Sequence, residues 1–204
     1  MTPLISVIMP TRPRSSIEAA VASIMAQSCQ DFEVHIIVDR DFRGAPWARN
    51  QGLDVARGRY VLFSDDDVIW EPEAFAIMVQ ALEEADGIRD DGWTVGYAYG
   101  GYLQHLSESA RKIIGNEPWD YVKLRRMNYI STMSLLRATC ARRWDTDILR
   151  LQDWDLWLTL AEEKIRGVWV GCAVFSTAHR RGITFGGTES WSHAVQVIRK
   201  KHRL

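Results

Sequence analysis

The sequence predicts an α/β fold built around a mainly parallel sheet. Short apolar runs alternate with amphipathic stretches over about the first 92 residues, in the order strand, helix, strand, helix, strand, helix. Such alternation is typical of parallel strands joined by crossover helices. The chain has 204 residues, of which 47% are hydrophobic and 25% charged, and this balance suits one globular domain and excludes disordered and coiled-coil chains.

The first half supplies the clearest elements. Leu4 to Met9 is an apolar run closed by Pro10, which predicts a buried strand. Ser15 or Ser16 can cap a following helix, whose apolar residues recur at helical spacing. The remaining elements of this half are expected to be a strand over 32–38, a helix over 47–56 that Gly58 ends, a strand over 60–63 and a helix from about residue 71.

The second half is less regular. It predicts a strand over 93–102, a helix over 108–114 and a strand over 129–136. Asp153 opens a strong helix over 154–164, and a last strand follows over 168–175. Because no internal repeat, linker or low-complexity segment interrupts the chain, we expect a single domain over residues 1–204.

Charge is unevenly spread along the chain. Residues 64–92 hold ten acids against one base, and residues 180–204 hold six Lys or Arg against one acid. The acidic middle indicates a cation site, and the basic end indicates a polyanion such as a phosphate-bearing substrate or a lipid surface. The alternative is a solvated acidic helix and a frayed basic end.

Three cysteines are scattered along the chain, which fits a reducing cytosol better than a disulfide framework. The apolar start lacks a basic region before it, so it is read as a strand and not as a signal peptide. No apolar run approaches the roughly 18 residues that a membrane span needs. We therefore expect a cytoplasmic protein without a membrane span.

Three adjacent carboxylates, Asp65, Asp66 and Asp67, follow the strand over 60–63 directly. In open α/β sheets, ligands collect at the carboxyl ends of strands. Adjacent carboxylates repel one another unless a cation or several donors compensate them. Oxygen ligands select a hard ion such as Mg²⁺ or Mn²⁺, and Asp65 and Asp67 would share one side of an extended segment. The alternative is a polar turn with exposed acids.

Four segments together resemble the nucleotide-sugar domain of family 2 glycosyltransferases, which have the GT-A fold. These segments are Ile5–Thr11, Ile36–Asp39, Ala48–Asp67 and Gln152–Leu158. They match an opening strand that ends in Pro-Thr, a strand that ends in Asp, an Ala-Arg-Asn-x-Gly helix start, a strand that ends in Asp-x-Asp, and a Glu-Asp-x-x-Leu-Trp segment. Their order and spacing make the resemblance fairly specific, although each motif is weak alone.

The resemblance implies a donor site in residues 1–92. Asp39 would accept a hydrogen bond from the base, usually uracil, with Pro10 and Thr11 against the same base. Arg49 would reach the base or the phosphates, a task that suits a cationic fork. The alternatives are that Asp39 caps a turn and that Arg49 pairs with a surface acid.

The resemblance also implies a metal. Asp65 would face the ribose and the ion, Asp67 would bind the ion, and Asp66 would turn toward the ribose or the sugar. His179 would complete the coordination or bind the diphosphate. The Mn²⁺ or Mg²⁺ would act as a Lewis acid on the departing diphosphate.

Residues 93–204 would hold the acceptor and the catalytic base. Asp153 matches the base of the family, and a single base without a carboxylate nucleophile implies inversion at the anomeric carbon. Asp153 can also be a plain helix N-cap, a position that lowers the pKa of an acid. Asp155 is the alternative base. An apolar stripe should anchor the helix in the core: Trp154, Trp157, Leu158 and Ala161.

Two departures from the family pattern concern the site. Only residues 40–48 separate Asp39 from Arg49, where relatives place a helix and a strand, so the sheet should be one strand shorter. Gln152 replaces the usual Glu beside Asp153. Neither departure removes a proposed metal or base residue.

The expected partners are a nucleotide-diphosphate sugar, with UDP favoured, and a glycan or lipid-linked acceptor. We expect no nucleic-acid partner, and the basic C-terminus leaves room for peripheral membrane contact. Two other classes stay open. A sugar-1-phosphate nucleotidyltransferase would need a Gly-rich loop after the first strand, and residues 9–15 contain no Gly. A non-catalytic nucleotide-sugar-binding module is favoured by the short chain.

Overall fold

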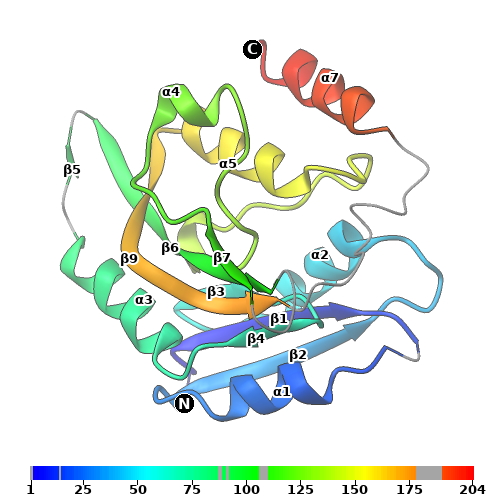
Figure 1. The fold of residues 1–204 in the computed structure, drawn as a ribbon, viewed down its shortest axis with the longest axis vertical. Coiled ribbons are helices and arrows are strands. Elements are labelled where there is room, and N and C mark those ends of the chain that lie inside the picture. Colours follow the sequence, from blue (N-terminus) through cyan, green and yellow to red (C-terminus); the bar gives the residue numbers. More distant parts are fainter. Residues whose placement is uncertain (1, 14, 87–88, 91, 106–109, 178–189) are drawn as a thin grey trace.

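A computed structural model describes residues 2–13, 15–86, 89–90, 92–105, 110–177 and 190–204 (Figure 1). Within them, one nine-stranded sheet has the order β2-β1-β3-β8-β6-β9-β4, and β5 and β7 pair with β6 off this path. The strands are β1 (Ile5–Thr11), β2 (Phe32–Val38), β3 (Tyr60–Phe63), β4 (Val68–Trp70), β5 (Arg89–Asp90), β6 (Trp93–His105), β7 (Arg111–Ile114), β8 (Leu135–Arg137) and β9 (Ile165–Thr177).

The strand directions confirm the expected α/β class. β1 is parallel to both β2 and β3, and β9 is parallel to β6. β8 lies antiparallel between β3 and β6, and β4 is antiparallel to β9. Five of the seven strands on the main path therefore point in one direction, so the carboxyl ends of β1, β2 and β3 share one edge of the sheet.

Helices cover both faces of this sheet (Figure 1). The helices are α1 (Glu18–Met25), α2 (Ala45–Val55), α3 (Ala74–Glu84), α4 (Tyr121–Leu124), α5 (Gln152–Glu162) and α7 (Trp191–Lys201), with a 3₁₀ turn η1 (Ala138–Cys140). One core holds α1 and α3 against alternate β1 residues such as Val7 and Met9. The other core holds α2, α5 and α7 against Ile8, which points to the opposite face.

The connection between β2 and α2 is short, as expected from the sequence. Residues 39–44 join the two elements with no further helix or strand, so β2 ends the sheet within the described residues. α2 lies very close to β1, because a Cβ atom placed on Gly52 would come within 2.2 Å of Ile8 Cγ2. This close approach explains the Gly in the Ala-Arg-Asn-Gln-Gly segment, which presents Arg49 to the end of the sheet.

The apolar stripe expected on α5 anchors it firmly. Trp154, Trp157, Leu158 and Ala161 are all buried. The indole of Trp157 stacks on Tyr97 at 4.6 Å and donates to the Ile130 carbonyl at 3.0 Å. Core packing therefore fixes the helix on which Asp153 lies.

Two expected elements are wrong. Residues 111–114 of the expected helix over 108–114 form strand β7, which pairs antiparallel with the end of β6, and residues 106–109 lie outside the described part. The strand expected over 129–136 contracts to β8 at Leu135–Arg137. In both places, pairing with β6 decides the structure rather than local propensity.

The chain ends also differ from the expectation. The N-cap of α1 is Ile17, and no side chain caps this helix, so neither Ser15 nor Ser16 serves as its cap. The basic C-terminus is not frayed, because it forms α7, which is capped by Ser190 and packed through Ile198. Among the described helices, none combines the length and the apolar character of a membrane span.

Candidate active site

The carboxyl ends of three neighbouring parallel strands meet at the candidate site. Thr11 ends β1, Asp39 follows β2 and Asp65 follows β3 shortly after its end. The Thr11 hydroxyl donates to Asp66 Oδ2 at 2.6 Å, and the Asp39 amide donates to the Thr11 carbonyl at 2.8 Å. Pro10 is buried within β1, beyond the residues that pair with β3, so its missing N–H does not interrupt that ladder.

Asp39 organises the short loop before α2. It is 3% exposed, its Oδ1 accepts from the Arg43 amide at 2.9 Å, and its Oδ2 accepts from the Gly44 amide at 2.7 Å. Gly44 has φ +99°, a conformation that suits glycine. The capping alternative for Asp39 is thus realised, while each of its oxygens keeps a further lone pair for a ligand.

Arg49 connects the two halves of the site. This side chain is almost fully buried, and its guanidinium donates to Asp65 Oδ1 at 2.7 Å and to Gln152 Oε1 at 2.8 Å. It also lies over the Trp144 ring at 4.5 Å, a cation–π contact. Since Gln152 directly precedes Asp153, one buried cation joins the acidic strand end to the start of α5.

The acidic triplet makes contacts within the protein. Asp65 pairs with Arg49 and Asp66 accepts from Thr11, while the side chain of Asp67 is exposed. In the part of the chain that the structure describes, no three His, Cys, Asp or Glu side chains are grouped to hold a metal ion. His179, the expected additional ligand, lies outside the described residues.

Asp153 is the second residue of α5, and the N-cap is Leu151, so the N-cap alternative for Asp153 does not hold. Burial raises the pKa of Asp153, and a hydrogen bond with Asn128, the Trp154 amide and the charge of Arg49 oppose this effect without reversing it. Desolvation therefore outweighs the lowering of the Asp153 pKa that is expected at a helix N-terminus. A carboxylate with a raised pKa is a better general base.

Two residues near Asp153 carried no recognisable signal in the sequence. Asn128 forms the hydrogen bond with Asp153 just described. Burial, together with the nearby negative charge of Asp153, raises the pKa of Tyr102 of β6. Both come from residues 93–145, where the sequence holds no interpretable motif. Only the fold brings them to the start of α5.

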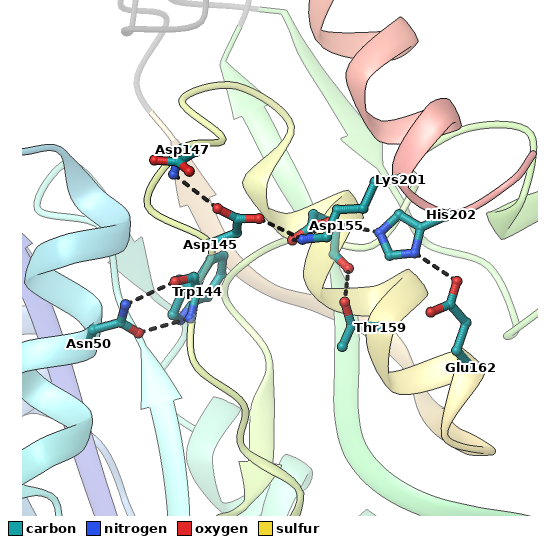
Figure 2. A network of polar contacts seen from close by, with 9 residues as sticks. All are labelled: Asn50, Trp144, Asp145, Asp147, Asp155, Thr159, Glu162, Lys201 and His202. Atoms are coloured by element: carbon teal, nitrogen blue, oxygen red, sulfur yellow. Dashed lines mark hydrogen bonds and ion pairs between the residues drawn. The ribbon is translucent and has the colours of Figure 1, made fainter.

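Asp155, the alternative base, is engaged elsewhere. Its carboxylate accepts from Lys201 Nζ and from His202 Nε2, both at the C-terminal end of α7 (Figure 2). Asp155 is 5% exposed. A buried carboxylate held by two such partners is poorly placed to accept a proton from an acceptor, so the geometry favours Asp153.

Comparison with known proteins agrees with this arrangement. The sequence profile described as Glycosyl transferase family 2 matches residues 38–144. An Escherichia coli protein, described as the UDP-Glc:alpha-D-GlcNAc-diphosphoundecaprenol beta-1,3-glucosyltransferase WfgD, is 20% identical over 186 residues, which cover 78% of this chain and 70% of that protein.

Solved structures share the fold. The S. aureus TarS fragment 1-349 in complex with UDP-GlcNAc matches 97% of this chain and 66% of its own length, with a TM-score of 0.69 and 16% identity. The mannosyltransferase PcManGT from Pyrobaculum calidifontis, in complex with GDP-Man and Mn²⁺, matches all of this chain and 62% of its own, with a TM-score of 0.60 and 17% identity. The chain thus spans slightly less than two thirds of these two solved chains, whose likeness establishes the GT-A fold.

Proposed function

The chain belongs to glycosyltransferase family 2, and from that premise we propose that it is an inverting enzyme. In this proposal it moves a sugar from a UDP-linked donor to a hydroxyl group of a glycan or lipid-linked acceptor. The observation that carries the proposal is the position of Arg49, whose guanidinium contacts both Asp65 on the donor side and Gln152 beside Asp153. A donor motif and a base candidate from distant parts of the sequence are thereby joined.

The donor side rests on the shared end of β1, β2 and β3. We assign Pro10, Thr11 and Asp39 to the base, and Asp65 and Asp66 to the ribose and the sugar. Arg49 supplies positive charge near the diphosphate. The choice of UDP is supported by the names of two relatives, since the E. coli protein is called a UDP-Glc transferase and the TarS fragment holds UDP-GlcNAc.

A divalent ion fits the chemistry of this corner. Mg²⁺ and Mn²⁺ take carboxylate oxygens, often only one or two, and fill their remaining positions with phosphate oxygens and water. Asp65, which follows β3, and the exposed Asp67, which directly precedes β4, would hold the ion, with His179 as a further ligand. A bound ion would supply Lewis-acid stabilisation of the departing diphosphate. The PcManGT complex with Mn²⁺ supports this assignment by analogy.

Asp153 acts as the base in the proposed reaction. A carboxylate oxygen of Asp153 takes the proton of the acceptor hydroxyl while the hydroxyl oxygen of the acceptor attacks the anomeric carbon. The bond to the diphosphate breaks on the opposite face, so the anomeric configuration inverts. Burial, which raises the pKa of Asp153, prepares the group for this proton transfer.

The test is to incubate the protein with UDP-sugars, Mn²⁺ and glycan or lipid-linked acceptors, and to measure free UDP and pyrophosphate. We expect free UDP, abolished by Asp153→Asn while UDP still raises the melting temperature of the variant. Asp147→Asn is the matched control, because Asp147 is exposed in the segment just before α5. Pyrophosphate released from a sugar 1-phosphate and a nucleoside triphosphate would instead show a nucleotidyltransferase. Nucleotide binding without turnover of any donor would show a binding module.

A further inference from the structure

The C-terminal helix α7 is tied to α5 by a cluster of charged side chains (Figure 2). We call this cluster the α5–α7 clamp, and it consists of Asp145, Asp155, Glu162, Lys201 and His202. None of these residues belongs to the donor site or is the proposed base. The clamp nevertheless closes on the first turn of the helix that carries Asp153.

Asp155 is the centre of the clamp. Its Oδ1 lies 2.7 Å from His202 Nε2, and its Oδ2 accepts from Lys201 Nζ at 2.9 Å. A carboxylate as buried as this one is expensive to desolvate unless it is paired and hydrogen-bonded. The end of α7 supplies both partners, so the ionised Asp155 depends on the docking of α7.

His202 is held between two carboxylates. Its Nδ1 lies 2.8 Å from Glu162 Oε1, and its Nε2 faces Asp155. Because an ionised carboxylate only accepts hydrogen bonds, the imidazolium form of His202 is the one that can donate to both carboxylates at once. Burial alone would lower the pKa of His202, but the bonds to Asp155 and Glu162 outweigh it and the net pKa is raised. The cation next to His202 in the clamp is Lys201, which precedes it in the chain and bonds Asp155 and Asp145.

The clamp also reaches the donor side of the site. Lys201 Nζ donates to Asp145 Oδ2 at 2.7 Å. The neighbouring Trp144 is fixed on α2, because its amide donates to Asn50 Oδ1 at 2.8 Å and its carbonyl accepts from Asn50 Nδ2 at 2.9 Å. Arg49, adjacent to Asn50, packs over the Trp144 ring. Figure 2 shows this chain of contacts from Asn50 to His202.

From these contacts we infer that Asp155, Lys201 and His202 are positioning residues for sugar transfer. They fix the first turn of α5, and with it Asp153, while Asp145 and Trp144 extend the same constraint to Arg49. This inference rests on the proposed function. A base displaced by about 1 Å can lose on the order of a hundredfold in rate. Docking that served stability alone would leave the rate of the folded protein unchanged.

The experiment compares kcat and the donor KM in variants of the end of α7. We expect Lys201→Ala to lower kcat by about 10- to 100-fold with little change in the donor KM. Lys201→Arg keeps the charge and should restore most of the rate. Lys200→Ala is the matched control, because Lys200 is the exposed neighbour on the same helix. All rates are measured at a temperature where circular dichroism shows each variant fully folded.

A pH profile supplies the readout that simple docking would not change. As pH rises through the raised pKa of His202, the imidazolium is lost, and we expect wild-type kcat to fall. Glu162→Gln removes one partner from the half-exposed side of the clamp, which should move this alkaline limb to lower pH. His202→Gln should show the lowered kcat and no limb.

The outcomes separate the two proposals. If the wild-type protein releases UDP but Lys201→Ala and His202→Gln keep the wild-type kcat, the clamp has no positioning role. If Lys201→Ala does not fold, an alkaline limb that stays in place in Glu162→Gln overturns the inference in the same way. Failure of the wild-type protein to turn over any donor refutes the proposed function instead.

Discussion

Replacement of Asp153 by Asn is expected to change activity and stability in opposite directions. Asn is nearly isosteric but cannot take the acceptor proton. General bases contribute about 10²- to 10⁴-fold, so kcat should fall by that factor, or by about 3 to 5 kcal/mol of transition-state stabilisation. The donor KM should change little, because Thr11, Asp65 and Arg49 are untouched.

The stability of the same variant follows from the raised pKa of Asp153. The unfolded chain titrates near the ordinary value of 3.8, and the folded chain holds the proton to higher pH. Folding stability therefore falls as pH rises from about 3.8 through the raised pKa. Above it, the buried charge costs about 1.4 kcal/mol for every pKa unit by which folding raises the value. Asn carries no charge, so at pH 7 the variant should be the more stable protein.

Urea unfolding at pH 7 and near the ordinary pKa of 3.8 measures this difference, which should shrink at the lower pH. Asp155→Asn, two residues along, is the contrasting variant. This substitution removes the buried negative charge that pairs with Lys201 and His202, so it should destabilise the fold by about 3 kcal/mol. An inactive Asp153→Asn protein that is less stable than the wild type at pH 7 would refute the argument that desolvation dominates. An active one would refute the base assignment.

Three further predictions concern the donor side and the packing beneath it. Asp67→Ala should abolish the Mn²⁺-dependent part of the thermal shift given by UDP, and chelation should do the same in the wild type. A full shift without any divalent ion would contradict the metal assignment. Arg49→Met should raise the donor KM and lower kcat, since Asp65 and Gln152 lose their cation. It should cost about 1 to 3 kcal/mol in urea unfolding, because the Asp65 side chain is 37% exposed and water can solvate it. Unchanged kinetics would contradict the proposed link between the two halves of the site. Gly52→Ala should lower stability by about 1 to 3 kcal/mol, because Ile8 must move from a 2.2 Å overlap, and an unchanged melting temperature would contradict the close packing of α2 on β1.

The first half of the fold was predictable because its local signals agree with its tertiary structure. The strand over 32–38 and the strand over 60–63 appear as β2 and β3 with the expected bounds. The second half depends on long-range pairing. β7 exists because it completes a hairpin with the end of β6, and its four residues carry no signal strong enough to announce it. α7 was not predicted either, although a local signal was present, because Ser190 can cap it and Ala194, Val195 and Ile198 recur at helical spacing.

The acidic triplet of the candidate site was visible because its three residues are contiguous and directly follow a predicted strand. The network around it was not visible. Arg49 and Gln152 are 103 residues apart, and the sequence gives no reason to join them. Asp155 looked like a second candidate base, and its actual partners, Lys201 and His202, lie at the far end of the chain. Such pairings are set by the packed fold and not by local pattern.

The short connection after β2 has a consequence for how the protein behaves in solution. Within the described residues, no strand covers the outer side of β2, and the apolar side chains of Ile36 and Val38 are 40% and 37% exposed there. The unpaired N–H and C=O groups of such an edge strand can pair with another extended chain. Phe32–Val38 contains neither proline nor lysine, the residues that often prevent this pairing. Ile36→Lys should therefore slow precipitation at high concentration while leaving sugar transfer intact.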